Sequence, residues 1–119
     1  SDNSFRSKLS NDMQQKLMAY KMKQLNNNSI QWSSYHDCPF VKKELVTEYM
    51  NITETGWYSK LYSIMVNIAG NAIYMNYPIT VNEISALCKE IDNSTGGWYK
   101  NRPMDVESQR ALDYVLQNM

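Results

Sequence analysis

The sequence predicts an all-α protein, a compact bundle of about five helices. Gly and Pro, the residues that most often interrupt helices, number 4 and 3 among 119 residues. Apolar residues recur at spacings of three and four in several segments, whereas no segment alternates cleanly between apolar and polar residues. A sheet therefore has little sequence to form from, and the helices are expected to share one hydrophobic centre in a single domain over residues 1–119.

The first two predicted helices cover residues 11–25 and 41–50, joined by a polar and aromatic connector. Ser10 or Asn11 can cap the first helix, and the Asn run at 26–28 ends it. Its apolar residues share one face: Met13, Leu17, Met18, Met22 and Leu25. The stripe of the second helix consists of Val41, Leu45, Val46, Tyr49 and Met50.

The most apolar helix is predicted over residues 57–75 and is placed at the centre of the bundle. Thr53 or Thr55 can cap its start, and Tyr77-Pro78 stops the chain from continuing it. Ala69, Gly70 and Ala72 are small and would let a neighbouring helix approach closely. Its broad apolar face consists of Trp57, Leu61, Ile64, Met65, Ile68, Ala72 and Ile73.

A capping box gives the clearest helix start in the sequence. The Thr80 hydroxyl can accept from the Glu83 amide while the Glu83 carboxylate reaches back, and Ile79 and Ile84 stand where a hydrophobic staple requires them. This helix is expected to reach Asp92, and a last helix, capped by Asp105, follows a loop over 93–103. Their apolar stripes are Ile84, Leu87, Cys88 and Ile91, then Ala111, Leu112, Val115, Leu116 and Met119.

Two short segments combine glycine, aromatic rings and cations. The first aromatic–basic segment is Gly56-Trp57-Tyr58-Ser59-Lys60, and the second is Gly97-Trp98-Tyr99-Lys100-Asn101-Arg102. Rings can stack on bases and cations can neutralise phosphates. The candidate residues for binding a nucleic acid or a nucleotide are therefore Trp57, Tyr58, Lys60, Trp98, Tyr99, Lys100 and Arg102. The alternative is a packing role, because a Trp at a helix entrance can close the end of a helical core.

The sequence lacks the residue patterns of common catalytic and metal sites. His36 is the single histidine, so no Ser-His-Asp or Cys-His arrangement has supporting spacing, and no phosphate-binding glycine loop occurs. His36, Cys38 and Cys88 are one short of the usual four zinc ligands. We therefore expect this chain to carry out no chemistry by itself and to hold no metal or cofactor. Cys38 and Cys88 could form one bridge, but two cysteines without a spacing motif fit a reducing cytoplasm as well or better.

Charge and hydropathy exclude two further classes. Lys plus Arg equals Asp plus Glu, at 12 each, so the formal net charge is zero. A protein dedicated to coating nucleic acid would be basic over its whole surface. No run of about 18 apolar residues is present to span a membrane, so no membrane partner is expected.

The sequence from Thr55 to Leu116 carries a resemblance to a known family. The segments that carry the resemblance are, in order, Gly56-Trp57-Tyr58-Ser59-Lys60-Leu61 with the helix to Met75, Ile79-Thr80-Val81-Asn82-Glu83-Ile84, Ile91-Asp92-Asn93, and the last helix around Arg110-Ala111-Leu112. This order resembles the small helix-bundle domain that follows the catalytic core in plasmid and phage primase-polymerases of the archaeo-eukaryotic primase class. Such domains often begin Gly-x-Arg-Asn, whereas in this chain Trp57-Tyr58-Ser59-Lys60 follows Gly56.

The resemblance implies an accessory domain of a replication protein in the cytoplasm of a bacterial or archaeal host. Such a bundle binds single-stranded DNA template or the initiating nucleotide during primer synthesis, beside a separate catalytic domain of the same polypeptide that holds Mg²⁺ or Mn²⁺. The chain would then be a fragment of a longer protein, which its polar start and apolar helical end also suggest.

The alternative is a non-catalytic interaction bundle that docks a helicase or a partner subunit. Zero net charge and the methionines Met13, Met18 and Met22 favour this second class, because flexible Met side chains form adaptable protein-binding surfaces.

Overall fold

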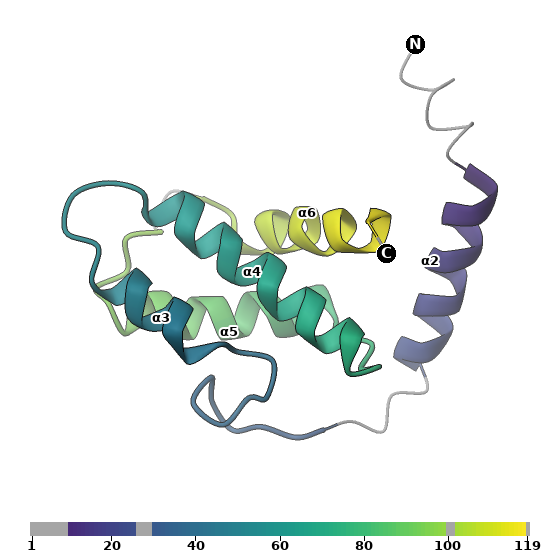
Figure 1. Cartoon of the computed structure of the whole chain (residues 1–119), viewed down its shortest axis with the longest axis horizontal. Coiled ribbons are helices and arrows are strands. Elements are labelled where there is room, and N and C mark those ends of the chain that lie inside the picture. The colour runs from purple at the N-terminus through teal and green to yellow at the C-terminus, as the bar shows by residue number, and fades with distance from the viewer. Residues whose placement is uncertain (1–9, 26–29, 100–101, 119) are drawn as a thin grey trace, which may run out of the picture.

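Helices account for most of residues 10–25, 30–99 and 102–118, which the computed structural model describes (Figure 1). The elements are α2 (Ser10–Leu25), α3 (Lys43–Met50), α4 (Trp57–Tyr74), α5 (Val81–Asn93) and α6 (Met104–Gln117). No strand occurs among these residues, so the predicted all-α bundle of five helices is confirmed.

The central position predicted for α4 is confirmed. α4 packs against both α5 and α6, with its most extensive contacts to α6, and α3 also packs on it (Figure 1). Its buried residues are Leu61, Ile64, Met65, Ile68, Ala69 and Ala72. The predicted close approach at Gly70 is wrong, because a Cβ built on Gly70 meets no atom within 4 Å. Ala69 and Ala72 are the small residues that face the core.

The capping box at the start of α5 is confirmed, but two other predicted caps are wrong. Glu83 N donates to Thr80 Oγ1 at 3.2 Å, and Thr80 N donates to Glu83 Oε1 at 2.8 Å. α4 follows Gly56 at φ 102°, a left-handed conformation that glycine tolerates and Thr does not, so neither Thr53 nor Thr55 caps it. α6 begins behind Pro103, which places Asp105 inside the first turn, where its charge suits the helix dipole.

The polar and aromatic connector before α3 supplies core residues, although no helical periodicity marks them. Phe40 is fully buried, and its ring centroid lies 5.7 Å from that of Trp32 and 4.9 Å from that of Tyr77. Tyr35 N donates to Glu90 Oε1 at 2.7 Å and so ties the connector to α5. α3 begins at Lys43, two residues later than predicted, and buries Val46 and Tyr49.

α2 stands apart from the other helices, at the opposite end of the molecule from the start of α4 (Figure 1). The predicted apolar face of α2 is not buried in the bundle at its methionines, because Met18 and Met22 are 67% and 57% exposed. α2 docks instead through Tyr20, whose ring is buried and whose hydroxyl donates to the Ile79 carbonyl at 2.6 Å. A phenol suits this position because it offers both an apolar ring and a donor. The side chains of Met13 and Leu25 lie outside the described residues, as does Met119.

Candidate nucleic-acid interface

The two aromatic–basic segments meet at the end of the bundle where α4 begins. The ring centroids of Trp57 and Trp98 lie 5.0 Å apart at an interplanar angle of 32°. Those of Tyr58 and Tyr99 lie 4.9 Å apart at 70°, an edge-to-face contact. We call these four residues the aromatic junction. Its tilted and edge-to-face contacts are the geometries that ring quadrupoles favour, so the junction holds the loop after α5 against α4.

Asp92, the penultimate residue of α5, positions the second segment. Its carboxylate is buried and accepts a hydrogen bond from Tyr99 N at 3.1 Å and from the Tyr49 hydroxyl at 2.5 Å. Its backbone carbonyl accepts from Gly97 N at 2.9 Å. Gly96 and Gly97, at φ 114° and 74°, let the chain turn back sharply enough to make these bonds. In the sequence, Asp92 marks the end of a predicted helix and belongs to the Ile91-Asp92-Asn93 part of the resemblance, but no local pattern reveals its partners.

The four rings of the junction differ in how much of them a ligand can reach. Tyr99 is 3% exposed, and burial together with the nearby Glu107 carboxylate raises its pKa to about 12. Trp57, Tyr58 and Trp98 are half-buried. Tyr99 is therefore a core ring, and the accessible ring surface belongs to the two tryptophans and Tyr58.

The two described cations of these segments, Lys60 and Arg102, have carboxylate or ring partners. Lys60 Nζ lies 2.7 Å from Glu48 Oε2 on the surface. The Arg102 guanidinium carbon lies 4.5 Å above the Tyr58 ring centroid, and its Nη1 is 3.6 Å from Glu107 Oε1. Lys100 lies outside the described residues. Of the predicted cations that the structure describes, Arg102 is the one that contacts the aromatic junction.

Arg110 is a neighbouring cation that sequence analysis did not select. Its Nη1 lies 2.6 Å from Glu107 Oε2, and its guanidinium carbon lies 5.2 Å from the Tyr62 ring centroid. Tyr58 and Tyr62 are four residues apart on α4, and Glu107 and Arg110 are three apart on α6. These helical spacings were visible in the sequence, but their pairing depends on α4 and α6 packing side by side.

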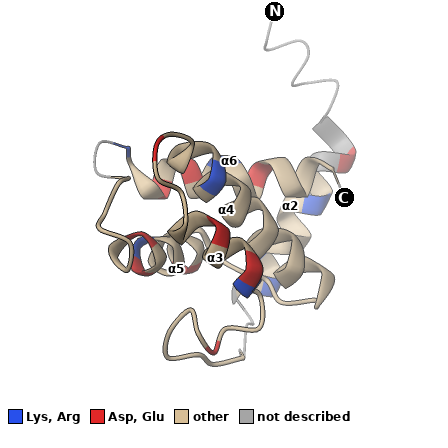
Figure 2. Ribbon diagram, turned by 60° about the vertical axis from the view of Figure 1, so that its left-hand side comes forward, with Lys and Arg blue, Asp and Glu red and all other residues tan. Residues whose placement is uncertain are grey.

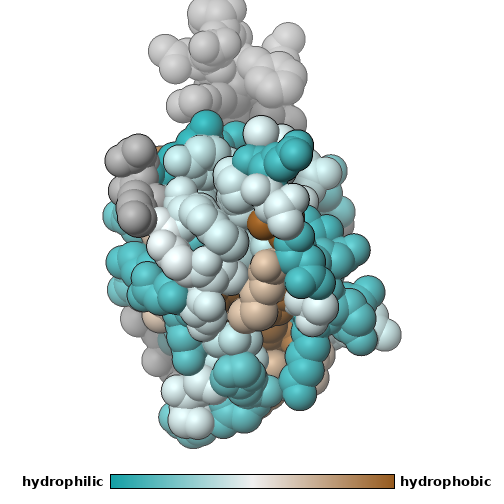
Figure 3. Space-filling view, turned by 90° about the vertical axis from the view of Figure 1, so that its left-hand side faces the viewer, coloured by the Kyte–Doolittle hydropathy of each residue, from teal (hydrophilic) through white to brown (hydrophobic). Residues whose placement is uncertain are grey.

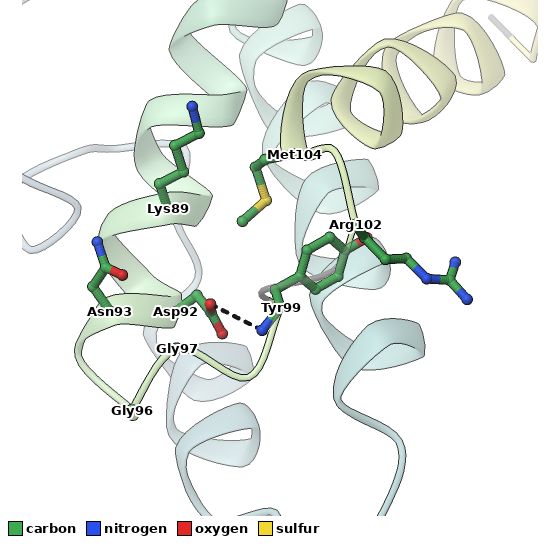
Figure 4. A pocket seen from close by; sticks show the side chains of 8 residues that line it. All are labelled: Lys89, Asp92, Asn93, Gly96, Gly97, Tyr99, Arg102 and Met104. Atoms are coloured by element: carbon green, nitrogen blue, oxygen red, sulfur yellow. Dashed lines mark hydrogen bonds between the residues drawn. The ribbon is translucent and has the colours of Figure 1, made fainter.

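A pocket of about 500 Å³ lies beside the junction, between the end of α5, the following loop and the start of α6 (Figure 4). Its lining residues are Lys89, Asp92, Asn93, Gly96, Gly97, Tyr99, Arg102 and Met104. Arg102 extends away from Lys89, on the other side of Tyr99. The two cations therefore flank the pocket from different directions, and each Asp92 oxygen already accepts one hydrogen bond within the protein.

The surface around the site is polar and mixed in charge. Figure 3 views this end of the molecule, where most visible residues are hydrophilic or intermediate and a narrow hydrophobic strip lies near the middle. Lys, Arg, Asp and Glu are interspersed over the described helices, with no region of a single sign (Figure 2). Binding of an anion here would depend on a few placed cations rather than on a broad basic surface.

Within residues 10–25, 30–99 and 102–118, no three His, Cys, Asp or Glu side chains gather as metal ligands do. Cys38 and Cys88 are buried free thiols, and burial raises the pKa of each above its usual value. Neither thiol is therefore activated as a nucleophile.

Comparison of the chain with protein-family models, with curated proteins and with solved structures gave no match. None of the helices in the described part of the chain is long and apolar enough to cross a bilayer. The function is therefore inferred from the side chains of the aromatic junction, the pocket beside it and the surrounding charges.

Proposed function

We propose that this chain is an accessory module that binds single-stranded DNA or a nucleotide, of the kind that adjoins the catalytic core of primase-polymerases. The observation that carries the proposal is the contact between the two aromatic–basic segments, whose Trp57 and Trp98 rings lie 5.0 Å apart. Partly accessible rings beside cations are the groups that hold a single strand, because every base has a face that stacks and every nucleotide has a phosphate.

In this proposal each accessible group has one role. Trp98 stacks on a base, and Arg102, whose side chain is 47% exposed, contacts the adjoining phosphate. Lys89, on the opposite side of the pocket, contributes a second positive charge. The glycines at 96 and 97 carry no side chain that would hinder the approach of a ligand to the loop. Lys60 contributes less, because Glu48 offsets its charge.

Binding of a labelled oligothymidylate, measured by fluorescence anisotropy over a series of salt concentrations, tests the proposal. Trp98→Ala should lose about 1–3 kcal/mol of affinity, the scale of one stacked base. Arg102→Gln should reduce the salt slope by about 0.7, the value for one phosphate contact to a single strand. Lys21→Gln, which removes an exposed charge from α2 at the far end, is the matched control and should change neither quantity.

Thermal melting of the same variants separates binding from packing. A stable Trp98→Ala protein with weakened DNA binding supports the proposal. If Trp98→Ala lowers the melting temperature while DNA affinity is unchanged, the aromatic junction is only a packing contact.

A second candidate function is docking of a protein partner such as a helicase or another subunit. The observation that favours it is the exposure of Met18 and Met22 on α2, at 67% and 57%. Unbranched Met side chains adapt to varied apolar surfaces. Absence of DNA binding by the unaltered chain would leave this candidate as the better one, and Met18→Asp should then weaken partner binding without altering the fold.

A further inference from the structure

Arg102, which lines the pocket, shares one carboxylate with a second guanidinium group, that of Arg110. Arg102 Nη1 lies 3.6 Å from one oxygen of Glu107, and Arg110 Nη1 lies 2.6 Å from the other. Glu107 is 8% exposed, whereas the side chains of Arg102 and Arg110 are 47% and 61% exposed. We call Arg102 and Arg110 the arginine pair. The group of three side chains carries a net positive charge, and its positive members face the solvent.

The arginine pair keeps donors available for a ligand. Each guanidinium has five N–H groups, and in the described part of the chain Glu107 is the only carboxylate that forms an ion pair with either arginine. A phosphate presents several acceptor oxygens, and guanidinium groups bind phosphate in paired, charge-assisted hydrogen bonds. The two groups flank the same carboxylate, so one phosphate lying beside it can receive donors from both.

Tyrosine rings hold the arginine pair in place. The Arg102 guanidinium lies over Tyr58 at 4.5 Å and the Arg110 guanidinium over Tyr62 at 5.2 Å. Tyr58 and Tyr62 are about one turn apart on α4, so the two cations follow one line along the contact between α4 and α6. Cations already ordered by stacking lose less conformational entropy when they bind a ligand than freely moving side chains do.

We infer that the arginine pair is a second phosphate subsite and that the ligand is an oligonucleotide rather than a single nucleotide. This inference rests on the proposed function. Arg102 lines the pocket, whereas Arg110, which pairs with the same Glu107 carboxylate, is not among the lining residues. A strand that places one nucleotide at the pocket carries its next phosphate past Arg102 towards Arg110.

The test compares a labelled oligothymidylate with thymidine 5′-monophosphate as ligands of the full chain. Arg110→Gln should weaken oligonucleotide binding about tenfold, the effect of one lost hydrogen bond to a charged group. It should also lower the salt slope by about 0.7. The affinity for the mononucleotide should stay unchanged, because Arg110 lies beyond the pocket. Lys21→Gln again serves as the matched control.

Glu107→Gln should change the oligonucleotide affinity in the opposite direction to Arg110→Gln. Neutralising the carboxylate frees donors of both arginines and adds one net positive charge, so oligonucleotide affinity should rise and the salt slope should steepen. A loss of stability in either variant would only lower affinity, so it cannot imitate this gain.

The outcomes separate the inference from the function on which it rests. If the unaltered chain binds the oligonucleotide but Arg110→Gln and Glu107→Gln leave the affinity and salt slope unchanged, the second subsite is refuted and the proposed function stands. Equal losses for both ligands in Arg110→Gln would also refute it. If the unaltered chain binds neither ligand, the proposed function itself fails. An acidic protein segment that binds in place of DNA, and is lost in Arg110→Gln, would assign the arginine pair to a protein partner and overturn the inference.

Discussion

α2 and the group of α4, α5 and α6 are held in different ways. The three helices enclose residues without solvent exposure, such as Ile68, Ile84 and Ala111, and pack on one another along their lengths. α2 makes few contacts, mainly with α6, and docks through Tyr20 and the hydrogen bond from Gln24 to the Ile79 carbonyl. Apolar burial along whole helices makes unfolding cooperative, whereas a helix held by a few side chains can open alone.

The largest effect is expected from a charge in the centre of the three-helix group. Ile68→Asp should unfold the chain, because an unpaired buried charge costs several kcal/mol against a typical total stability of about 5–15 kcal/mol. Met18→Asp on α2, at a position 67% exposed, is the matched control and should melt close to the unaltered chain. Circular dichroism of both variants measures this. A cooperatively melting Ile68→Asp protein would contradict the assigned core.

Removing the anchor of α2 should have a smaller and local effect. Tyr20→Ala deletes a buried ring and its 2.6 Å hydrogen bond to the Ile79 carbonyl. The free energy that holds α2 against the other helices should fall by about 3 kcal/mol. Hydrogen exchange should show α2 amides becoming unprotected while those of α4 and α5 remain slow. Faster exchange in all helices to the same degree would mean that α2 belongs to the cooperative core.

Removing the capping box of α5 should cause an intermediate loss of stability in the group of α4, α5 and α6. Thr80→Ala removes the oxygen that accepts from Glu83 N and should cost about 1 kcal/mol. Since α5 is expected to unfold with α4 and α6, the whole melting transition should shift to lower temperature, and the proposed DNA binding should not change. A transition that does not move would indicate that the box contributes nothing to α5.

The smallest effect should be a gain in stability. Gly70 lies inside α4, and a methyl group added there meets no atom within 4 Å. Gly70→Ala should therefore stabilise the chain by about 0.5–1 kcal/mol, because Ala loses less backbone entropy in a helix. Chemical denaturation should show a higher midpoint with an unchanged slope. A lower midpoint would show that α4 needs the glycine for a close contact.

Local patterns predicted the helices well but their surroundings poorly. The central helix and the capping box depend on residues close in sequence, such as Ile64 with Ile68 and Thr80 with Glu83, so spacing was sufficient to find them. Phe40 is buried by Trp32 and Tyr77, which lie far apart in the chain, and no periodicity marks such a residue. The methionines of α2 fit a helical stripe, but the tertiary fold buries Tyr20 instead.

In the candidate site, too, the features set by neighbouring residues could be predicted and those set by tertiary packing could not. The two aromatic–basic segments are visible in the sequence, and the structure places Trp57 beside Trp98 and Tyr58 beside Tyr99. The sequence could not show that Tyr99 would be buried or that Asp92 would hold the loop, because both depend on the packing of α5 against its neighbours. Whether these residues bind a nucleic acid stays a prediction.

The hydrogen bond from Tyr99 N to the Asp92 side chain closes a loop of the backbone, because donor and acceptor are seven residues apart. Such a closed loop fixes the number of residues between its ends but not their identity. Exposed positions within it that do not line the pocket, such as Ser94, should therefore accept many substitutions, whereas an inserted residue would displace either Tyr99 or the glycine turn. Related chains that keep this junction should vary at these positions while conserving the length of the loop.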